Sequence, residues 1–295
     1  MSLNIRSALF FCSLLSVSTL SLSVASAEND RYAAVQVEAQ KLSAQLYYLK
    51  GAGGNMAAVT GPQGVLLVDA QFAEMAAKIQ KKLAELSSNA KISTLVNTHH
   101  HGDHVNGNKV LGQGIAIIAH QNVYQRLSTD EQFDPAGLPT VLVDQRLNLT
   151  LNGEQIELLK MPASHTDGDI VVRFITSNVL HTGDLMFADR FPFIDTKSGG
   201  SVQGYIENTK VLIASIDDQT KVIPGHGELT NKAGLAKSLA MMEQTFAKVQ
   251  SYKKQGMTEA QVVKQGLGAE WASWNWNFIT EERWIKTLYQ AAPAS

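Results

Sequence analysis

The segment from Thr98 to His104, which reads THHHGDH, brings together four of the chain's eight histidines and one aspartate. Imidazole and carboxylate groups are the nitrogen and oxygen ligands that zinc, iron and manganese take from proteins. Residues of the same types end apolar runs elsewhere: Asp69 in GVLLVDA, His165 in MPASHTDGD, Asp184 in LHTGD and His226 in VIPGHG. We predict that they surround one metal centre, because strand ends can bring distant parts of a sequence to one edge of a sheet.

The three other histidines are predicted to stay away from the metal. His100 lies between two neighbours that would converge on an ion, so its side chain must point elsewhere. His120 and His181 end apolar runs, and the commoner fate of such a histidine is a hydrogen-bonded structural role.

The elements that must position these residues alternate between strands and helices. Residues 35–70 read as strands separated by glycine-rich turns, residues 74–86 and 204–216 have the apolar spacing of helices, and Asn152-Gly153 marks a hairpin. Each half runs strands, helix, strand. This pattern favours an α/β fold in which two sheets pack together with helices outside, a four-layer αββα sandwich. No linker divides residues 28–295, so we predict one domain that includes the C-terminal helices.

Residues 1–27 have the features of a signal peptide. Arg6 supplies the positive charge, residues 8–24 form an apolar stretch, and Ala25-Ser26-Ala27 is a small-residue cleavage site. An uncleaved membrane anchor is the alternative, but the stretch is short for a span. We therefore predict a periplasmic or secreted protein that has no membrane attachment after cleavage. Cys12, the only cysteine, would be removed, so the mature chain would have neither disulfides nor thiolate ligands.

The composition of the chain argues against nucleic acid as a partner. The formal net charge is −2, with 44% hydrophobic and 18% charged residues. This is an ordinary globular balance, without the basic surface that nucleic acid binding requires.

The order of the candidate ligands is similar to that of the metallo-β-lactamase superfamily, and the similarity covers most of the mature chain up to His226. The resemblance implies the αββα fold and a binuclear centre. It also implies an acidic residue at the position of Asp69, which would fix an imidazole or a ligand loop by hydrogen bonding. In the implied ligand set, His99, His101 and His165 hold the first metal, Asp103, His104 and His226 hold the second, and Asp184 bridges the two.

This ligand set implies a metal-dependent hydrolase with two zinc ions, and iron or manganese also suit nitrogen and oxygen ligands. Two metals lower the pKa of water, generate a shared hydroxide that attacks a carbonyl carbon, and stabilise the resulting oxyanion. Asp103 would be the catalytic residue that orients the hydroxide. The implied substrates are lactones, lactams, esters or thioesters.

Two positions bear on the substrate. Zinc β-lactamases commonly have a cysteine where this chain has Asp184, and a lysine that grips the substrate carboxylate where it has Phe187. Both departures count against efficient β-lactam hydrolysis, and Asp184 resembles the oxygen-bridged site of glyoxalase II and lactonases. Three alternatives stay open: a β-lactamase proper, an iron-dependent oxidoreductase of the same fold acting on a sulfur substrate, and a noncatalytic metal-binding accessory protein.

The segment that follows Asp184 supplies candidate substrate residues. Arg190 is a candidate for gripping an anionic group, and three phenylalanines are candidates for an apolar wall, namely Phe187, Phe191 and Phe193. Core packing for the rings and a solvated surface position for Arg190 are the alternative.

All four tryptophans fall in the last part of the chain, and three of them lie between Trp271 and Trp276. They would dock the C-terminal helices, which is the commoner role, cover the binding groove, or form a homodimer contact.

Overall fold

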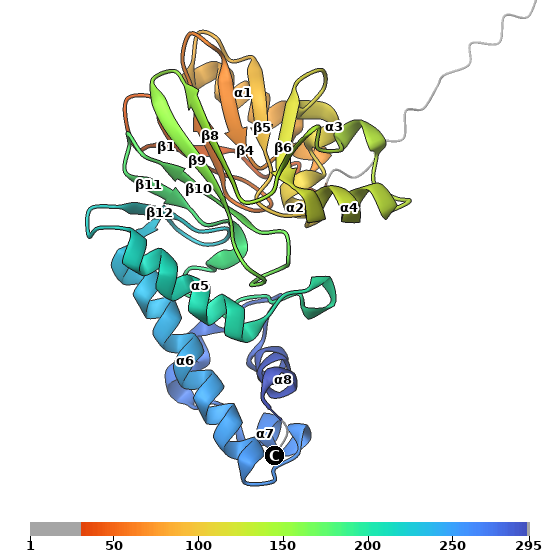
Figure 1. The fold of residues 1–295 in the computed structure, drawn as a ribbon, viewed down its shortest axis with the longest axis vertical. Coiled ribbons are helices and arrows are strands. Elements are labelled where there is room, and N and C mark those ends of the chain that lie inside the picture. Colours follow the sequence, from red (N-terminus) through yellow and green to blue (C-terminus); the bar gives the residue numbers. More distant parts are fainter. Residues whose placement is uncertain (1–30, 294–295) are drawn as a thin grey trace, which may run out of the picture.

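The computed structural model describes residues 31–293 and shows two sheets packed face to face (Figure 1). The predicted signal peptide lies outside the described residues. The first sheet contains seven strands in sequence order: β1 (Glu38–Lys41), β2 (Leu46–Lys50), β3 (Met56–Val59), β4 (Val65–Val68), β5 (Ile92–Val96), β6 (Ala116–His120) and β7 (Val141–Val143). Its β1–β4 half is antiparallel and its β4–β7 half is parallel.

The second sheet has the order β13-β12-β11-β10-β9-β8, and only β11 and β12 run parallel. The predicted hairpin joins β8 and β9, with Asn152 and Gly153 both at positive φ, 53° and 81°, as a type I′ turn requires. The strands are β8 (Arg146–Leu151), β9 (Glu154–Lys160), β10 (Ile170–Phe174), β11 (Val179–His181), β12 (Lys221–Ile223) and β13 (Thr230–Asn231).

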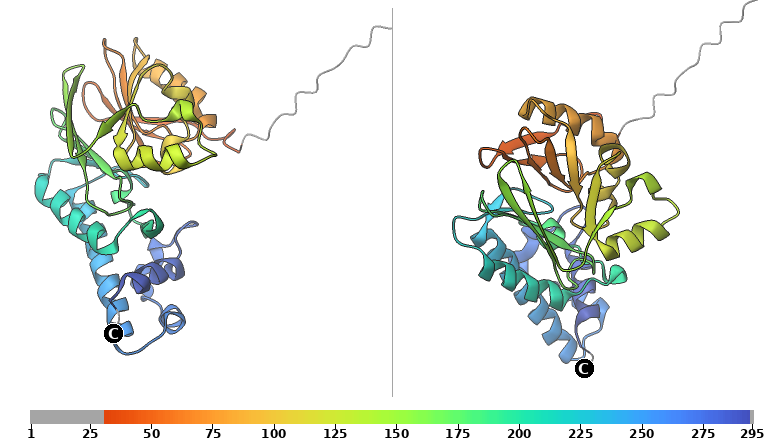
Figure 2. Two further views of the ribbon diagram at one scale, coloured as in Figure 1. Left: turned by 45° about the vertical axis from the view of Figure 1, so that its right-hand side comes forward. Right: turned by 45° about the horizontal axis from the view of Figure 1, so that its top comes forward.

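Helices cover the outer face of each sheet, so the predicted four-layer sandwich is confirmed (Figures 1 and 2). The outer helices of the first sheet are α1 (Ala76–Leu86), α2 (Gly102–Val105), α3 (Asn108–Leu111) and α4 (Gln121–Thr129). Helix α1 buries Ala76, Ile79 and Leu83, which recur at helical spacing and pack on the sheet. Strands β3 and β4 are buried on both faces because they lie between α1 and the second sheet.

The second sheet is covered by α5 (Val202–Ser215) and the beginning of α6 (Lys232–Lys254). Helix α5 begins two residues before the predicted position because the Ser201 hydroxyl accepts a hydrogen bond from the Gly204 amide, which caps the helix there. The other predicted helix, residues 74–86, also differs at its start. A separate 3-10 turn, Ala73–Met75, comes first, and α1 begins at Ala76.

The C-terminal helices extend away from the sandwich as a lobe, which is blue in Figures 1 and 2. The lobe contains the rest of α6 with α7 (Glu259–Gln265), a 3-10 segment (Ala269–Trp274) and α8 (Glu281–Ala291). An apolar cluster centred on the fully buried Trp284 holds it together and includes one face of α5. None of the helices within residues 31–293 has the length and apolar character that a membrane span needs.

Candidate metal centre

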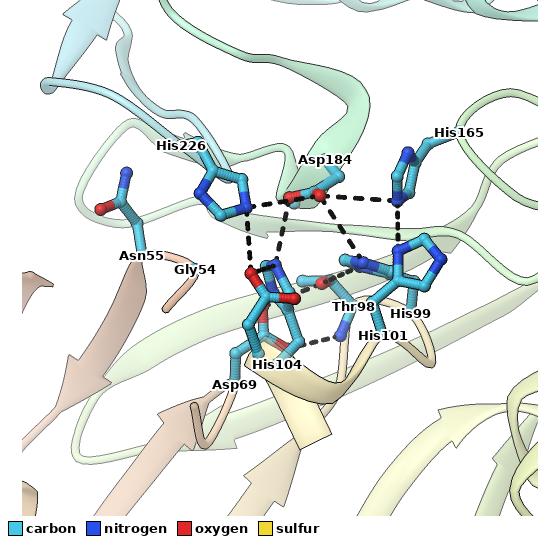
Figure 3. Close-up of polar contacts among 12 residues, drawn as sticks. Gly54, Asn55, Asp69, Thr98, His99, His101, His104, His165, Asp184 and His226 are labelled. Atoms are coloured by element: carbon cyan, nitrogen blue, oxygen red, sulfur yellow. Dashed lines mark hydrogen bonds and ion pairs between the residues drawn. The ribbon is translucent and has the colours of Figure 1, made fainter. Parts of the chain in front are cut away.

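All seven predicted ligands meet at one edge of the sandwich, at the ends of strands. Figure 3 labels each of them except Asp103. The loop after β5 carries His99 and His101, and α2 follows it directly with Asp103 and His104. The other three are His165 between β9 and β10, Asp184 in a single 3-10 turn after β11, and His226 just after β12. The ligands therefore follow strands of both sheets, as we predicted from their positions at the ends of apolar runs.

The ligands fall into two groups. The ligand atoms of His99, His101, His165 and Asp184 lie within 4.8 Å of one another, and so do those of Asp103, His104 and His226. Asp184 faces both groups (Figure 3). Its Oδ2 lies 3.5 Å from His165 Nε2 and 3.5 Å from His226 Nε2, while its Oδ1 lies 3.2 Å from His104 Nε2. This central position suits a carboxylate that bridges two ions.

Hydrogen bonds fix which ring nitrogen the first group presents. His165 Nδ1 lies 2.7 Å from the Phe193 carbonyl, which only accepts, so Nδ1 carries the proton and Nε2 is a bare lone pair. His101 Nε2 lies 3.1 Å from Asp195 Oδ2 and donates to it, which leaves Nδ1 bare. His165 Nε2 and His101 Nδ1 are only 2.8 Å apart. Two lone pairs at this distance repel unless a cation lies beside them.

Asp69 orients one histidine from each group. Its Oδ2 lies 2.7 Å from His104 Nδ1 and accepts that proton, so His104 presents Nε2. Asp69 also accepts from the Thr98 amide and hydroxyl, each at 2.8 Å. Since the Thr98 hydroxyl proton is donated to Asp69, its oxygen accepts from His99 Nδ1 at 3.0 Å, and His99 also presents Nε2. The role predicted for Asp69 is the one its contacts support: it holds His104 directly and His99 through Thr98.

Unpaired polar atoms inside the cluster test whether a metal fits. Among residues 31–293, His99 Nε2, His104 Nε2 and Asp184 Oδ1 are buried without a hydrogen-bond partner. Such groups cost free energy unless something compensates them. All three point into the space between the ligands (Figure 3). Imidazole nitrogens and carboxylate oxygens suit zinc, and also iron or manganese, so the residues fit a pair of divalent cations.

Electrostatics keep the carboxylates of the centre ionised. Burial disfavours charge on Asp184, but the imidazoles of His226 and His104 hold the pKa of its carboxyl well below the usual range. Burial alone would also raise the pKa of the Asp103 carboxyl. The nearby His104 and His226 have the larger effect, and they lower this pKa to about 2. In turn, Asp184 and Asp103 overcome burial and raise the pKa of His226 to about 9.

Metal ions and protons therefore compete for the same imidazoles, and we expect metal affinity to fall on acidification. A pKa near 9 means that His226 holds its proton below that pH, and an ion must displace it. Affinity should thus rise with pH up to about 9, and metal binding at pH 7 should release protons. Calorimetry of zinc uptake in buffers with different ionisation enthalpies measures the release. Uptake without proton release would contradict this reading.

Gly54 approaches His104 so closely that a side chain would collide with it. An added Cβ would lie 2.3 Å from His104 Nε2, closer than atoms tolerate. We expect Gly54→Ala to lose one metal equivalent and about tenfold or more of the metal affinity, because His104 must move out of the second group. Metal analysis checks this. Gly153→Ala is the control, since a Cβ there meets nothing within 4 Å and only the backbone cost of its positive φ remains.

A pocket of about 740 Å³ opens directly over the ligands. His101, Asp103, Asp184 and His226 line its floor. Its walls come mainly from the end of β2 and the loop after it, the segment after Asp184, the loop after β12 and the C-terminal lobe, with single residues after β4 and at the start of α2. The wall residues are Lys50, Gly51, Ala52, Gly53, Asn55, Phe72, Gly102, Phe187, Arg190, Phe193, Gly227, Glu228, Trp276 and Phe278. The size and apolar walls suit a small organic substrate.

The predicted substrate residues separate into two sets. Phe187, Arg190 and Phe193 line the pocket. Phe191 does not: it is fully buried in the helical lobe and stacks on Trp284 with ring centroids 6.0 Å apart. Its role in an apolar substrate wall is therefore corrected to core packing, because it has no surface to offer a ligand.

The histidines predicted to avoid the metal have other partners or stand apart from the seven. His120 Nδ1 accepts from the Asn122 amide and caps α4. His181 Nδ1 accepts from the Gly183 amide, and its Nε2 donates to the Asn55 carbonyl. His100 lies beside His101 and Asp195, close enough for a metal to join the three, and its Nδ1 is buried without a partner. The His101 nitrogen nearest Asp195 is, however, already engaged by that carboxylate.

Several residues of the site were not predicted from the sequence. Thr98 and Asp195 orient ligands, and Phe278 lines the pocket. Trp276 beside it lines the pocket too, which is the groove-covering alternative given for the tryptophans. Asp195 stands in the segment already expected near the metals, so its carboxylate was a signal that could have been used. Trp274, by contrast, is buried in the lobe, as the docking role predicts.

Comparisons with known proteins agree with this geometry. The family model "Metallo-beta-lactamase superfamily" matches residues 49–226. A hydroxyacylglutathione hydrolase of Dictyostelium discoideum is 29% identical over 168 residues, 55% of this chain and 58% of that protein. The metallo-beta-lactamase type 2 of Bacillus cereus is 22% identical over 183 residues, 61% of this chain and 70% of that protein. The chain spans about half the length of the hydroxyacylglutathione hydrolases that it matches.

Solved structures show the same fold. The DIM-1 metallo-beta-lactamase superposes with a TM-score of 0.61 at 19% identity, covering 71% of this chain and 98% of that one. A double mutant of the sec-alkyl sulfatase PisA1 gives a TM-score of 0.70 at 16% identity, covering 86% of this chain and 50% of that one. Family model, fold and ligand clusters together establish that this chain belongs to the metallo-beta-lactamase superfamily.

Proposed function

We propose that the protein is an exported binuclear zinc hydrolase that opens a lactone, lactam, ester or thioester. The observation that carries the proposal is the position of Asp184 between two complete ligand groups, on the floor of an open pocket. A purely structural metal site has closed coordination and needs no such access. Hydroxyacylglutathione hydrolases and metallo-beta-lactamases among the relatives support a carbonyl substrate.

The chain's own residues have distinct parts in this reaction. When bound, the two ions supply an activated water nucleophile and positive charge for the developing oxyanion. Asp103 lines the pocket and stays ionised, since its pKa is lowered to about 2, so it can accept a hydrogen bond from the attacking water and aim it. The outer hydrogen bonds from Asp69, Thr98 and Asp195 keep the imidazoles in position throughout.

The wall of the pocket favours other substrates over β-lactams. Phe187 stands where the common zinc β-lactamases have a lysine, and its ring stacks on His226 with centroids 5.1 Å apart and planes at 13°. It offers no charge to a β-lactam carboxylate at this point. A β-lactamase proper therefore ranks below a hydrolase of other carbonyl compounds. A mono-iron oxidoreductase ranks lower still, because it would not need the complete second ligand group of Asp103, His104 and His226.

A hydrolysis panel on zinc-loaded protein tests the proposal, with β-lactams, homoserine lactones, thioesters, aryl esters and phosphoesters as substrates. We expect two zinc equivalents, turnover of at least one carbonyl class, loss of activity after chelation and recovery with added zinc. One iron equivalent with no hydrolysis would favour the oxidoreductase. Turnover of phosphoesters alone would overturn the carbonyl assignment.

Export is a separate part of the proposal and rests on the sequence of residues 1–27. Mass spectrometry of the protein from fractionated cells tests it. We expect the mature chain to begin at Glu28 and to be found outside the cytoplasm. An intact N-terminus on cytoplasmic protein would refute this part and leave the hydrolase assignment untouched.

A further inference from the structure

We propose that Arg190 and Trp276 form a subsite for a negatively charged substrate group, so that the substrate is a carbonyl compound with a flat apolar part that ends in a carboxylate or a similar anion. The identity of the scissile bond rests on the proposed function. The anion subsite itself rests on the following contacts.

Arg190 is a cation without a carboxylate partner. It lines the pocket and is half-buried, and within residues 31–293 no acidic side chain forms an ion pair with it. Its neighbour in sequence, Asp189, is instead paired with Lys237 at 2.6 Å. The other cation that lines the pocket, Lys50, is paired with Glu228. A guanidinium left free beside a pocket is suited to bind an anion with two parallel hydrogen bonds.

Trp276 holds this cation in place and links it to the metal ligands. The Arg190 Cζ lies 5.2 Å from the centroid of the Trp276 ring, a cation–π contact. The same ring is 6.0 Å from the His226 ring and 5.8 Å from the Phe187 ring. Its Nε1 donates to the Phe191 carbonyl at 2.9 Å, which fixes its orientation. The Trp276 ring therefore contacts both the free guanidinium and a predicted metal ligand, His226.

Aromatic side chains form the pocket wall between Arg190 and the metal ligands. Phe278 packs edge-on against both Trp276 and Phe193, with centroids 5.5 and 5.2 Å away, and is 47% exposed. Arg283 lies against the outer side of this wall, 4.3 Å from the centroid of Phe278, and donates to that residue's carbonyl. An exposed aromatic held this firmly is built to contact a ligand. A substrate with its carbonyl at the metals and its anion on Arg190 would lay an apolar part along this wall.

Binding of a matched probe pair to the zinc-loaded protein tests the subsite without any turnover. The probes are 2-naphthalenesulfonate and methyl 2-naphthyl sulfone, which share the ring and the sulfonyl oxygens and differ in charge. By calorimetry we expect the sulfonate to bind about tenfold more tightly, as a charge-assisted contact allows. In Arg190→Gln the two affinities should agree within about twofold, and Arg190→Lys should restore part of the preference.

Two further variants separate this reading from a general effect of charge. Arg146→Gln removes one positive charge from an exposed arginine on β8 that pairs with Glu157 and should keep the full preference, because Arg146 is not among the residues that line the pocket. Trp276→Leu should weaken both probes. An unchanged preference in Arg190→Gln would overturn the subsite, because the metal centre would then account for anion binding. Failure of the sulfonate to bind saturably to the wild-type protein would overturn it as well.

Turnover distinguishes failure of the subsite from failure of the proposed function. Phenyl esters with and without a carboxylate on the acyl chain are hydrolysed in parallel by wild type and by Arg190→Gln. Hydrolysis of both esters with equal kcat/KM in wild type would overturn the subsite and leave the hydrolase assignment standing. A probe preference lost in Arg190→Gln, with no hydrolysis of any carbonyl substrate, would support the subsite and overturn the proposed function.

Discussion

Asp184→Ala is expected to lower kcat/KM by about 1,000-fold or more while the fold is retained. Asp184 lies within 3.5 Å of ligand histidines in both groups, so its loss weakens both ions, and the metals supply several kcal/mol of transition-state stabilisation. Metal content should fall below two equivalents. The fold should persist because the variant removes a buried charge rather than core packing. Hydrolysis rates, elemental analysis and circular dichroism measure the three effects, and His101→Ala should behave alike for the first group.

The control for these variants is His100→Ala, in the same histidine segment but outside the seven ligands. It should keep two metal equivalents and wild-type activity. Full activity in Asp184→Ala would refute the bridging assignment, and loss of one metal from His100→Ala would show that the group of His100, His101 and Asp195 binds metal instead.

Asp69→Asn is expected to reduce the affinity for both metals by about 10- to 100-fold, the usual effect of losing an outer hydrogen-bond partner of a metal ligand. Asp69 accepts three hydrogen bonds, from the Thr98 amide, the Thr98 hydroxyl and His104 Nδ1. An asparagine has one accepting oxygen, and its amide group would oppose a donor. The backbone should tolerate the change, since the residue has φ 63° and asparagine adopts this left-handed region readily.

Zinc competition with a chelator measures the two affinities, and Asp195→Asn is the matched comparison. Among the ligands, the Asp195 carboxylate bonds to His101 and its backbone amide donates to the His165 carbonyl, both in the first group, so that variant should weaken the first ion and spare the second. If Asp69→Asn also weakened a single ion, the connection from Asp69 through Thr98 to His99 would be wrong.

The sequence predicted the architecture and the meeting of the seven ligands, because both depend on local patterns. Apolar runs marked the strands, and residues that can bind a metal, such as His165 and His226, followed the ends of those runs. The ring nitrogen that each histidine presents could not be predicted. His101 and His165 are oriented by Asp195 and the Phe193 carbonyl, and only the folded chain brings that segment beside them.

The aromatic residues were harder to place for a related reason. Phe191 and Phe193 are alike in sequence, yet the first is core and the second lines the pocket. Trp274 and Trp276 divide in the same way. The segment that contains the tryptophans packs against the segment that contains the phenylalanines, through the Phe191 amide to the Trp274 carbonyl and the Trp276 ring to the Phe191 carbonyl. Such long-range pairing decides which ring faces the pocket.

The origin of the pocket walls has a consequence for how this protein can diversify. Every metal ligand belongs to the sandwich, whereas Trp276 and Phe278 belong to the helical lobe. Substitutions of Phe278, whose ring packs on Trp276 and Phe193, can therefore change which molecules the pocket accepts at little risk to metal loading. Part of the selectivity of this protein is thus encoded apart from the residues that would hold the metals.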